Sequence, residues 1–98
     1  MSLPVVLRPE AVQDLEDIKA WYNGRLPGLG DTFARRAAKV LDTIGQLPEL
    51  YGFVWQDVRA ATIKRHPHVV YYRVHADRVE VFAVLHGRQD AAAWQARA

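Results

Sequence analysis

The sequence predicts an α+β domain in the order β-α-α-β-β-β, with a helical hairpin packed on one face of a mainly antiparallel four-stranded sheet. Two consecutive stretches in the first half place apolar residues at helical spacing, and a short apolar segment precedes them. The second half contains two arms rich in Val and Tyr around a polar turn, which is the pattern of a β-hairpin. Because each helical stripe is too apolar to face water alone, the two helices should together cover one face of the sheet.

Length and composition favour one domain over residues 1–98, since the chain is too short for two. There is no cysteine, which excludes a disulfide framework, a thiol nucleophile and a thiolate metal site. No run approaches the ~18 apolar residues of a membrane span, and Met1–Leu7 lacks the pattern of a signal peptide. We therefore expect a cytoplasmic protein with no membrane partner.

The first half should form a strand and two helices. Leu3–Leu7 is the expected strand, and Pro9 with Glu10 suits the first turn of a helix that ends at Asn23-Gly24. A second helix should begin near Asp31, with Asp31 or Gly30 as its cap, and end near Gly45 and Pro48. The expected buried stripes are Ala11, Val12, Leu15, Ile18 and Tyr22 on the first helix, and Phe33, Ala37, Val40, Leu41, Ile44 and Leu47 on the second.

The second half should contribute the other three strands and a short helical tail. A loop over Pro48–Asp57 precedes a strand at Val58–Lys64, followed by the hairpin arms Val69–Val74 and Val79–Leu85 and the tail Ala91–Arg97. Counting reversals of direction makes the first strand antiparallel to the second and the fourth.

The register of the hairpin follows from its turn at Ala76-Asp77. Pairing about this turn sets His75 opposite Arg78, Arg73 opposite Glu80 and Tyr71 opposite Phe82. Because side chains alternate along a strand, one face becomes almost purely apolar. The other face, which we expect to be partly open, would carry Tyr71, Arg73, Glu80 and His86.

The chain resembles the RelE/ParE superfamily of toxins from bacterial type II toxin–antitoxin systems, and it is closer to the ParE-like branch. The resemblance rests on VLRPEAVQDLEDIKAWY, on DTIGQLPELYG, and above all on KRHPHVVYYRVHADRVEVFAVLHGRQDAAAW. It implies a compact toxin domain with the element order given above, and a cognate antitoxin protein whose extended or helical tail wraps the toxin.

Within the superfamily, two activities are open, and a degenerate toxin that only binds its antitoxin is the third alternative. ParE-like members resemble inhibitors of DNA gyrase that act by binding, whereas RelE-like members resemble endoribonucleases that cut mRNA on the translating ribosome. If this chain were a nuclease, His86 would act as acid or base, and Arg73 and Arg88 would hold the phosphate. The tail RQDAAAWQARA lacks the further basic groups and the Tyr or His typical of RelE-like nucleases, which favours gyrase as the target.

Cations gather in the half of the chain from Arg59 onward, although the formal net charge is only +2. Such a distribution suggests an anionic partner, and an ordinary solvated surface would explain it equally well. Candidates for binding the target or an anion are Arg59, Lys64, Arg65, Arg73 and Arg88. The alternative for Arg73 is a cross-strand ion pair with Glu80. Arg35, Arg36 and Lys39 could also hold an anionic partner, but the solvated side of the second helix explains them better.

Aromatic side chains are the candidates for binding the antitoxin: Trp21, Tyr22 and Trp94. Each tryptophan could instead be a packing residue, and exposure of Trp21 or Trp94 would favour the antitoxin. His66-Pro67-His68 raises the question of a metal, but a turn structure explains this stretch better. We expect no metal and no cofactor.

Overall fold

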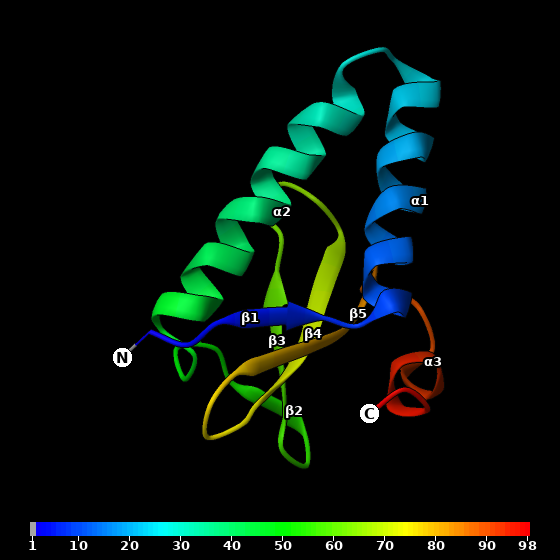
Figure 1. The fold of residues 1–98 in the computed structure, drawn as a ribbon. Coiled ribbons are helices and arrows are strands. Elements are labelled where there is room, and N and C mark those ends of the chain that lie inside the picture. The colour runs from blue at the N-terminus through cyan, green and yellow to red at the C-terminus, as the bar shows by residue number, and fades with distance from the viewer. Residues whose placement is uncertain (1) are drawn as a thin grey trace.

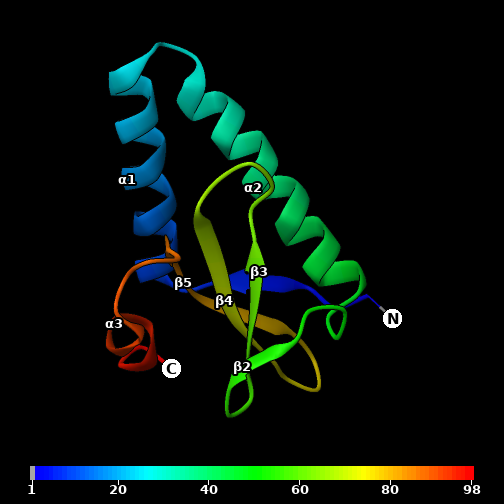
Figure 2. The same ribbon diagram turned by 180° about the vertical axis from the view of Figure 1, so that it is seen from behind.

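The computed structural model describes residues 2–98. The elements in chain order are β1 (Val5–Leu7), α1 (Pro9–Arg25), α2 (Leu29–Gln46), β2 (Phe53–Trp55), β3 (Val58–Thr62), β4 (His68–Val74), β5 (Val79–His86) and α3 (Ala91–Gln95). The helices α1 and α2 form an antiparallel hairpin on one side of a five-stranded sheet (Figure 1), and the view from behind brings the sheet in front of that hairpin (Figure 2). The predicted α+β class and helical hairpin are confirmed, with one more strand than expected.

The strand order of the sheet is β1-β5-β4-β3-β2, and every neighbouring pair is antiparallel except the parallel pair β1 and β5. The prediction that the first and last strands run antiparallel is wrong. The error arises from β2, a strand of three residues that lies within the stretch expected to be a loop. An additional strand adds one reversal of chain direction, so that β5 runs the same way as β1.

The turn between the helices depends on two glycines. Gly28, with φ at 94°, caps the N-terminus of α2, so the prediction of a start near Asp31 is two residues late. Gly30 lies where α2 packs closely against α1. Its N–H donates to the Asn23 side-chain oxygen at 2.7 Å, and a Cβ there would clash with the carbonyl oxygen of Lys19.

The main core lies between the helical hairpin and the sheet. It joins buried residues of both layers: Ala11, Phe33, Ala37, Val40 and Ile44 from the helices, and Ala61, Ile63, Val70, Tyr72, Val79, Val81 and Val84 from or beside the strands. Two residues of the predicted stripes are exposed instead, Val12 at 44% and Leu47 at 52%. Burial also raises the pKa of Tyr72 to about 12.

A second, smaller core closes the other face of the sheet. The short helix α3 begins at its cap Asp90, whose side chain accepts a hydrogen bond from the Ala92 N–H. It places Trp94 over Tyr71, with ring centroids 4.5 Å apart and planes inclined by 13°. Among residues 2–98, no helix has the length and apolar character needed to cross a membrane.

Candidate functional site

A β-bulge in the hairpin decides which predicted site residues can meet. Near the turn the register is as predicted, with Arg73 opposite Glu80 and Tyr72 opposite Val81, but it then shifts and pairs Tyr71 with Ala83. Phe82 is the additional residue, so the prediction that it faces Tyr71 is wrong. A bulge moves all later side chains of its strand to the other face relative to simple alternation.

The bulge separates His86 from Arg73. His86 pairs with His68, and the two rings are 5.6 Å apart. His68 in turn contacts Tyr22 and Phe33 of the helices, so this end of the strand faces the helical hairpin. Arg73 lies on the opposite face, and the predicted grouping of Arg73 with His86 is therefore wrong.

Arg73 pairs with Asp57, an acid that the predicted strand register does not indicate. Its Nε donates to Asp57 Oδ2 at 2.8 Å, and this hydrogen bond is the main reason why the pKa of Asp57 is lowered. The predicted pair of Arg73 with Glu80 does not form although the two residues are opposite each other. Glu80 instead accepts from Arg8 and from His75 Nε2, and the His75 bond contributes most to lowering its pKa.

The sheet face on which Arg73 lies is largely covered. Trp94 is only 6% exposed and Tyr71 only 7%, because α3 packs across the strands and Trp55 meets the Trp94 ring edge-on at 6.0 Å. An ion pair of 2.6 Å between Arg97 and Asp14 ties the tail to α1. The prediction of a partly open face lined by Tyr71 is wrong, and Trp94 is a packing residue that offers little surface to an antitoxin.

Three histidines lie together between the helices and the turn that joins β3 to β4. His66 Nδ1 is 2.9 Å from the Tyr22 hydroxyl, and its Nε2 is 3.1 Å from an Arg36 nitrogen. Because the guanidinium can only donate, His66 accepts at Nε2 and donates from Nδ1 as a neutral ring. Burial, followed by the charge of Arg36, lowers the pKa of His66. Burial also lowers the pKa of His68, followed by repulsion from His86 and His66.

Among residues 2–98, no group of three or more His, Cys, Asp or Glu side chains is placed to hold a metal ion. The prediction that His66-Pro67-His68 serves turn structure fits the hydrogen bond from the His66 N–H to the Ile63 carbonyl, at 3.0 Å.

The cations predicted to bind the target or an anion lie at separate positions in the fold. Arg59 donates to the Tyr51 carbonyl at 2.6 Å and lies over the Phe53 ring, while Arg73 is paired with Asp57. Arg88 is exposed beyond β5, where its backbone N–H donates to His86 Nδ1. Lys64 and Arg65 are brought together with Arg36 and Lys39 of α2 around a cavity of about 230 Å³. Sequence reasoning assigned those two α2 residues to the solvated helix face.

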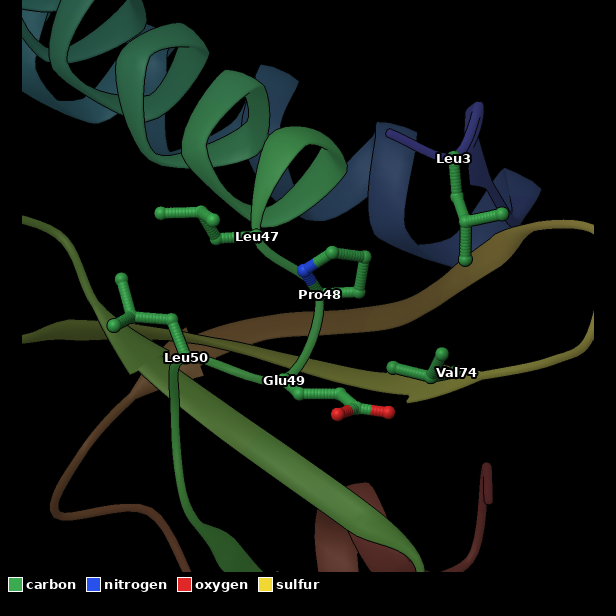
Figure 3. Close-up of a pocket in the computed structure, with 6 residues that line it drawn as sticks. All are labelled: Leu3, Leu47, Pro48, Glu49, Leu50 and Val74. Carbon is green, nitrogen blue, oxygen red and sulfur yellow. The ribbon is translucent and has the colours of Figure 1, made fainter. Parts of the chain in front are cut away.

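An apolar hollow of about 350 Å³ lies where α2 ends. Its lining comes from three separate segments: Leu3, Leu47, Pro48, Glu49, Leu50 and Val74. Figure 3 shows these side chains around the hollow, with the Glu49 carboxylate at its border. Leu50 is 59% exposed, and the neighbouring Phe53 of β2 is 60% exposed. Sequence reasoning missed this surface, although the apolar residues in LPELYG, within an expected loop, are a usable signal. The hollow can take up apolar side chains of a partner protein.

Comparison with known proteins identifies the family. The family model described as the ParE toxin of the type II toxin–antitoxin system parDE matches residues 5–91. A solved structure titled as the chromosomal ParDE toxin–antitoxin system from P. aeruginosa superposes with a TM-score of 0.75 at 16% identity. The alignment covers 85% of this chain and 94% of that one. No curated protein matches significantly by sequence. The match over residues 5–91 shows that the chain belongs to the ParE toxin family of type II toxin–antitoxin systems.

Proposed function

We propose that the chain is a toxin that inhibits DNA gyrase by binding it. We propose further that it acts as a single toxin domain in the cytoplasm, where a cognate antitoxin neutralises it. Membership of the ParE family supports the toxin role. The observation that carries binding over catalysis is the separation of His86 from Arg73 by the bulge. An RNA-cutting site needs an acid or base and a phosphate-holding cation around one phosphate, and these two side chains lie on opposite faces of the sheet.

The remaining nuclease candidates support the same proposal. Arg73 is neutralised by Asp57, and its guanidinium lies near the ring of the buried Phe82. Arg88 stands on the exposed segment after β5, with no second cation on that segment before Arg97. Ribosome-dependent cleavage of mRNA is therefore the alternative against which gyrase inhibition is tested.

The test of the target uses purified components. Gyrase, relaxed plasmid and ATP are mixed with the purified chain, and supercoiling is followed by gel electrophoresis. We expect inhibition that increases with toxin concentration and remains in an Arg73→Gln, His86→Gln double variant. Uninhibited supercoiling by folded toxin would contradict gyrase as the target, and loss of inhibition in the double variant would contradict the neutral role of those two residues.

We propose that the antitoxin covers the apolar hollow near the end of α2. Leu47 and Leu50 are exposed there beside a cavity large enough for one or two apolar side chains, and an exposed apolar patch of this kind marks a site of protein interaction. The Glu49 carboxylate at its border suits a basic residue next to those anchors on the antitoxin.

Leu50→Gln tests this surface, with Val12→Gln on α1 as the matched control because Val12 is also exposed. Titration calorimetry with the purified antitoxin should show an affinity loss of about tenfold or more for Leu50→Gln, in the range of interface anchors. Val12→Gln should bind like the unmodified chain. Equal affinity for both variants would contradict this placement of the antitoxin.

Trp21, 56% exposed, and the half-buried Tyr22 remain candidates for a second contact with the antitoxin. The variant Trp21→Ala tests this second contact in the same titration.

A further inference from the structure

A cavity with four cations opens between α2 and the turn from β3 to β4. We call it the basic cavity. It has a volume of about 230 Å³ and is lined by Arg36, Lys39, Val40, Lys64 and Arg65. Because the first two cations come from one helix and the last two from a turn distant in sequence, folding itself brings the four charges together.

No acid balances this charge. The lining contains no Asp or Glu, and the ion pairs found within residues 2–98 involve none of the four cations. Like charges held close together repel, so such a cluster is a place where an anion is stabilised.

At the lining of this cavity, the backbone of Arg65 has an unfavourable conformation. Its φ is 68°, in the left-handed region, and the turn is closed by the His66 N–H donating to the Ile63 carbonyl. Glycine or asparagine adopts this conformation more readily than arginine. Strain of this kind tends to persist where a side chain has a function.

Arg36 is fixed in place by a hydrogen-bond chain. The Tyr22 hydroxyl contacts His66 Nδ1 at 2.9 Å, and His66 Nε2 accepts from Arg36 at 3.1 Å. One nitrogen of the guanidinium is thereby held, and its other donors have no partner among residues 2–98 and can reach a ligand at the cavity. His66 is a positioning residue in this arrangement.

We propose that the basic cavity binds phosphate groups of a nucleic-acid backbone. Two arginines and two lysines around one cavity match the several acceptor oxygens of a phosphodiester. Lys39, Lys64 and Arg65 are exposed, so the site is open to a ligand larger than the cavity itself. The only apolar lining residue is Val40, which gives a peptide no pocket for its side chains. This binding is independent of the proposed action on gyrase and needs no second protein.

The experiment measures the salt dependence of binding with the purified chain and a fluorescent 20-base-pair DNA duplex. Four phosphate contacts predict that affinity falls about 100-fold between ~50 and ~200 mM salt. A Lys64→Gln, Arg65→Gly double variant should lower that factor to about tenfold. The control is Arg78→Gln, which removes a cation at the opposite end of β4 and should leave the salt dependence unchanged.

Two further measurements make the outcome decisive. The Arg65→Gly single variant should unfold at a higher temperature than the unmodified chain while binding DNA more weakly, so weaker binding cannot result from unfolding. Competition with unlabelled RNA, inorganic phosphate and polyglutamate should show displacement by RNA only. An unchanged salt dependence in the double variant, an equal effect of Arg78→Gln, or displacement by polyglutamate at the same charge concentration would overturn the proposal. Displacement by inorganic phosphate at low millimolar concentration would assign the cavity to a free anion.

Discussion

The two faces of the sheet are closed by different chemistry. Against the helical hairpin, the sheet buries an apolar core bordered by His66 and His68, whose pKa values burial lowers. On the opposite face, the smaller core around Trp94 lies beside the ion pairs of Glu80 and Asp57, whose pKa values are lowered by His75 and Arg73 respectively. The first face therefore depends on neutral rings and the second on charged carboxylates, and the two should fail in different ranges of pH.

The largest expected effect is on the face closed by α3. Trp94→Ala removes the ring stacked on Tyr71 and should lower the free energy of unfolding by about 4 kcal/mol. Urea denaturation measures this loss. The matched control is Trp21→Ala, because Trp21 is 56% exposed and its removal should cost under about 0.5 kcal/mol. Equal losses for the two variants would mean that α3 does not pack on the sheet as described.

The next effect concerns the ionic part of the same face. Glu80→Gln weakens its charged hydrogen bonds with Arg8 and His75 and should cost about 2 kcal/mol at pH 7. Because the pKa of Glu80 is lowered on folding, its contribution is present above the ordinary value of 4.5 and is lost as pH falls through the lower value of the folded state. Denaturation at a series of pH values should show the two proteins converging in strong acid. Asp77→Asn, which changes an exposed pair, serves as control, and a gap that persists unchanged in strong acid would contradict the assignment.

A stabilising change is expected at the turn beside the helices. Arg65→Gly relieves the left-handed conformation and should raise the free energy of unfolding by about 1 kcal/mol. Lys64→Gly, at the neighbouring position with no positive φ, is the comparison and should not stabilise the fold. Thermal unfolding of both variants at neutral pH is sufficient, and a lower midpoint for Arg65→Gly would rule out strain at this residue.

The smallest effect is a loss of stability in mild acid, and it comes from the face of the sheet that packs on the helices. The pKa values of His66 and His68 are lowered on folding, so the unfolded chain binds protons first as pH falls below the ordinary value of 6.5. Stability should therefore be full well above that pH and decline as pH falls through it toward the lower pKa values of the folded state. His66→Gln should flatten this decline without touching the loss in strong acid. A stability that is constant over this range in the unmodified chain would contradict the neutral state of the two rings.

Sequence patterns predicted the helical face well and the opposite face poorly, for physical reasons. Helical periodicity and the glycines between the helices depend on local spacing, which a sequence displays directly. The bulge at Phe82 lies where Tyr71, Phe82 and Trp94 pack together, and no local pattern signals it. That single additional residue moves His86 away from Arg73.

The strand β2 was equally hidden from sequence reasoning. It has only three residues, follows Gly52 and shows no clear alternation, so nothing distinguishes Phe53–Trp55 from a loop. Long-range ion pairs are similarly invisible in one sequence. Register could place Glu80 opposite Arg73, but it could not show that Asp57 takes the arginine and Arg8 takes the glutamate. The basic residues at the β3–β4 turn were predicted, whereas their partners on α2 required the fold.

The central claim is that this toxin acts by binding and not by cutting RNA. The most direct measurement induces the chain in cells that lack the antitoxin, and follows plasmid supercoiling and the 5′ ends of mRNA in the same samples. We predict plasmid relaxation with intact messages, retained by the Arg73→Gln, His86→Gln double variant. Cuts in mRNA phased with codons, with plasmid supercoiling unchanged, would contradict the account.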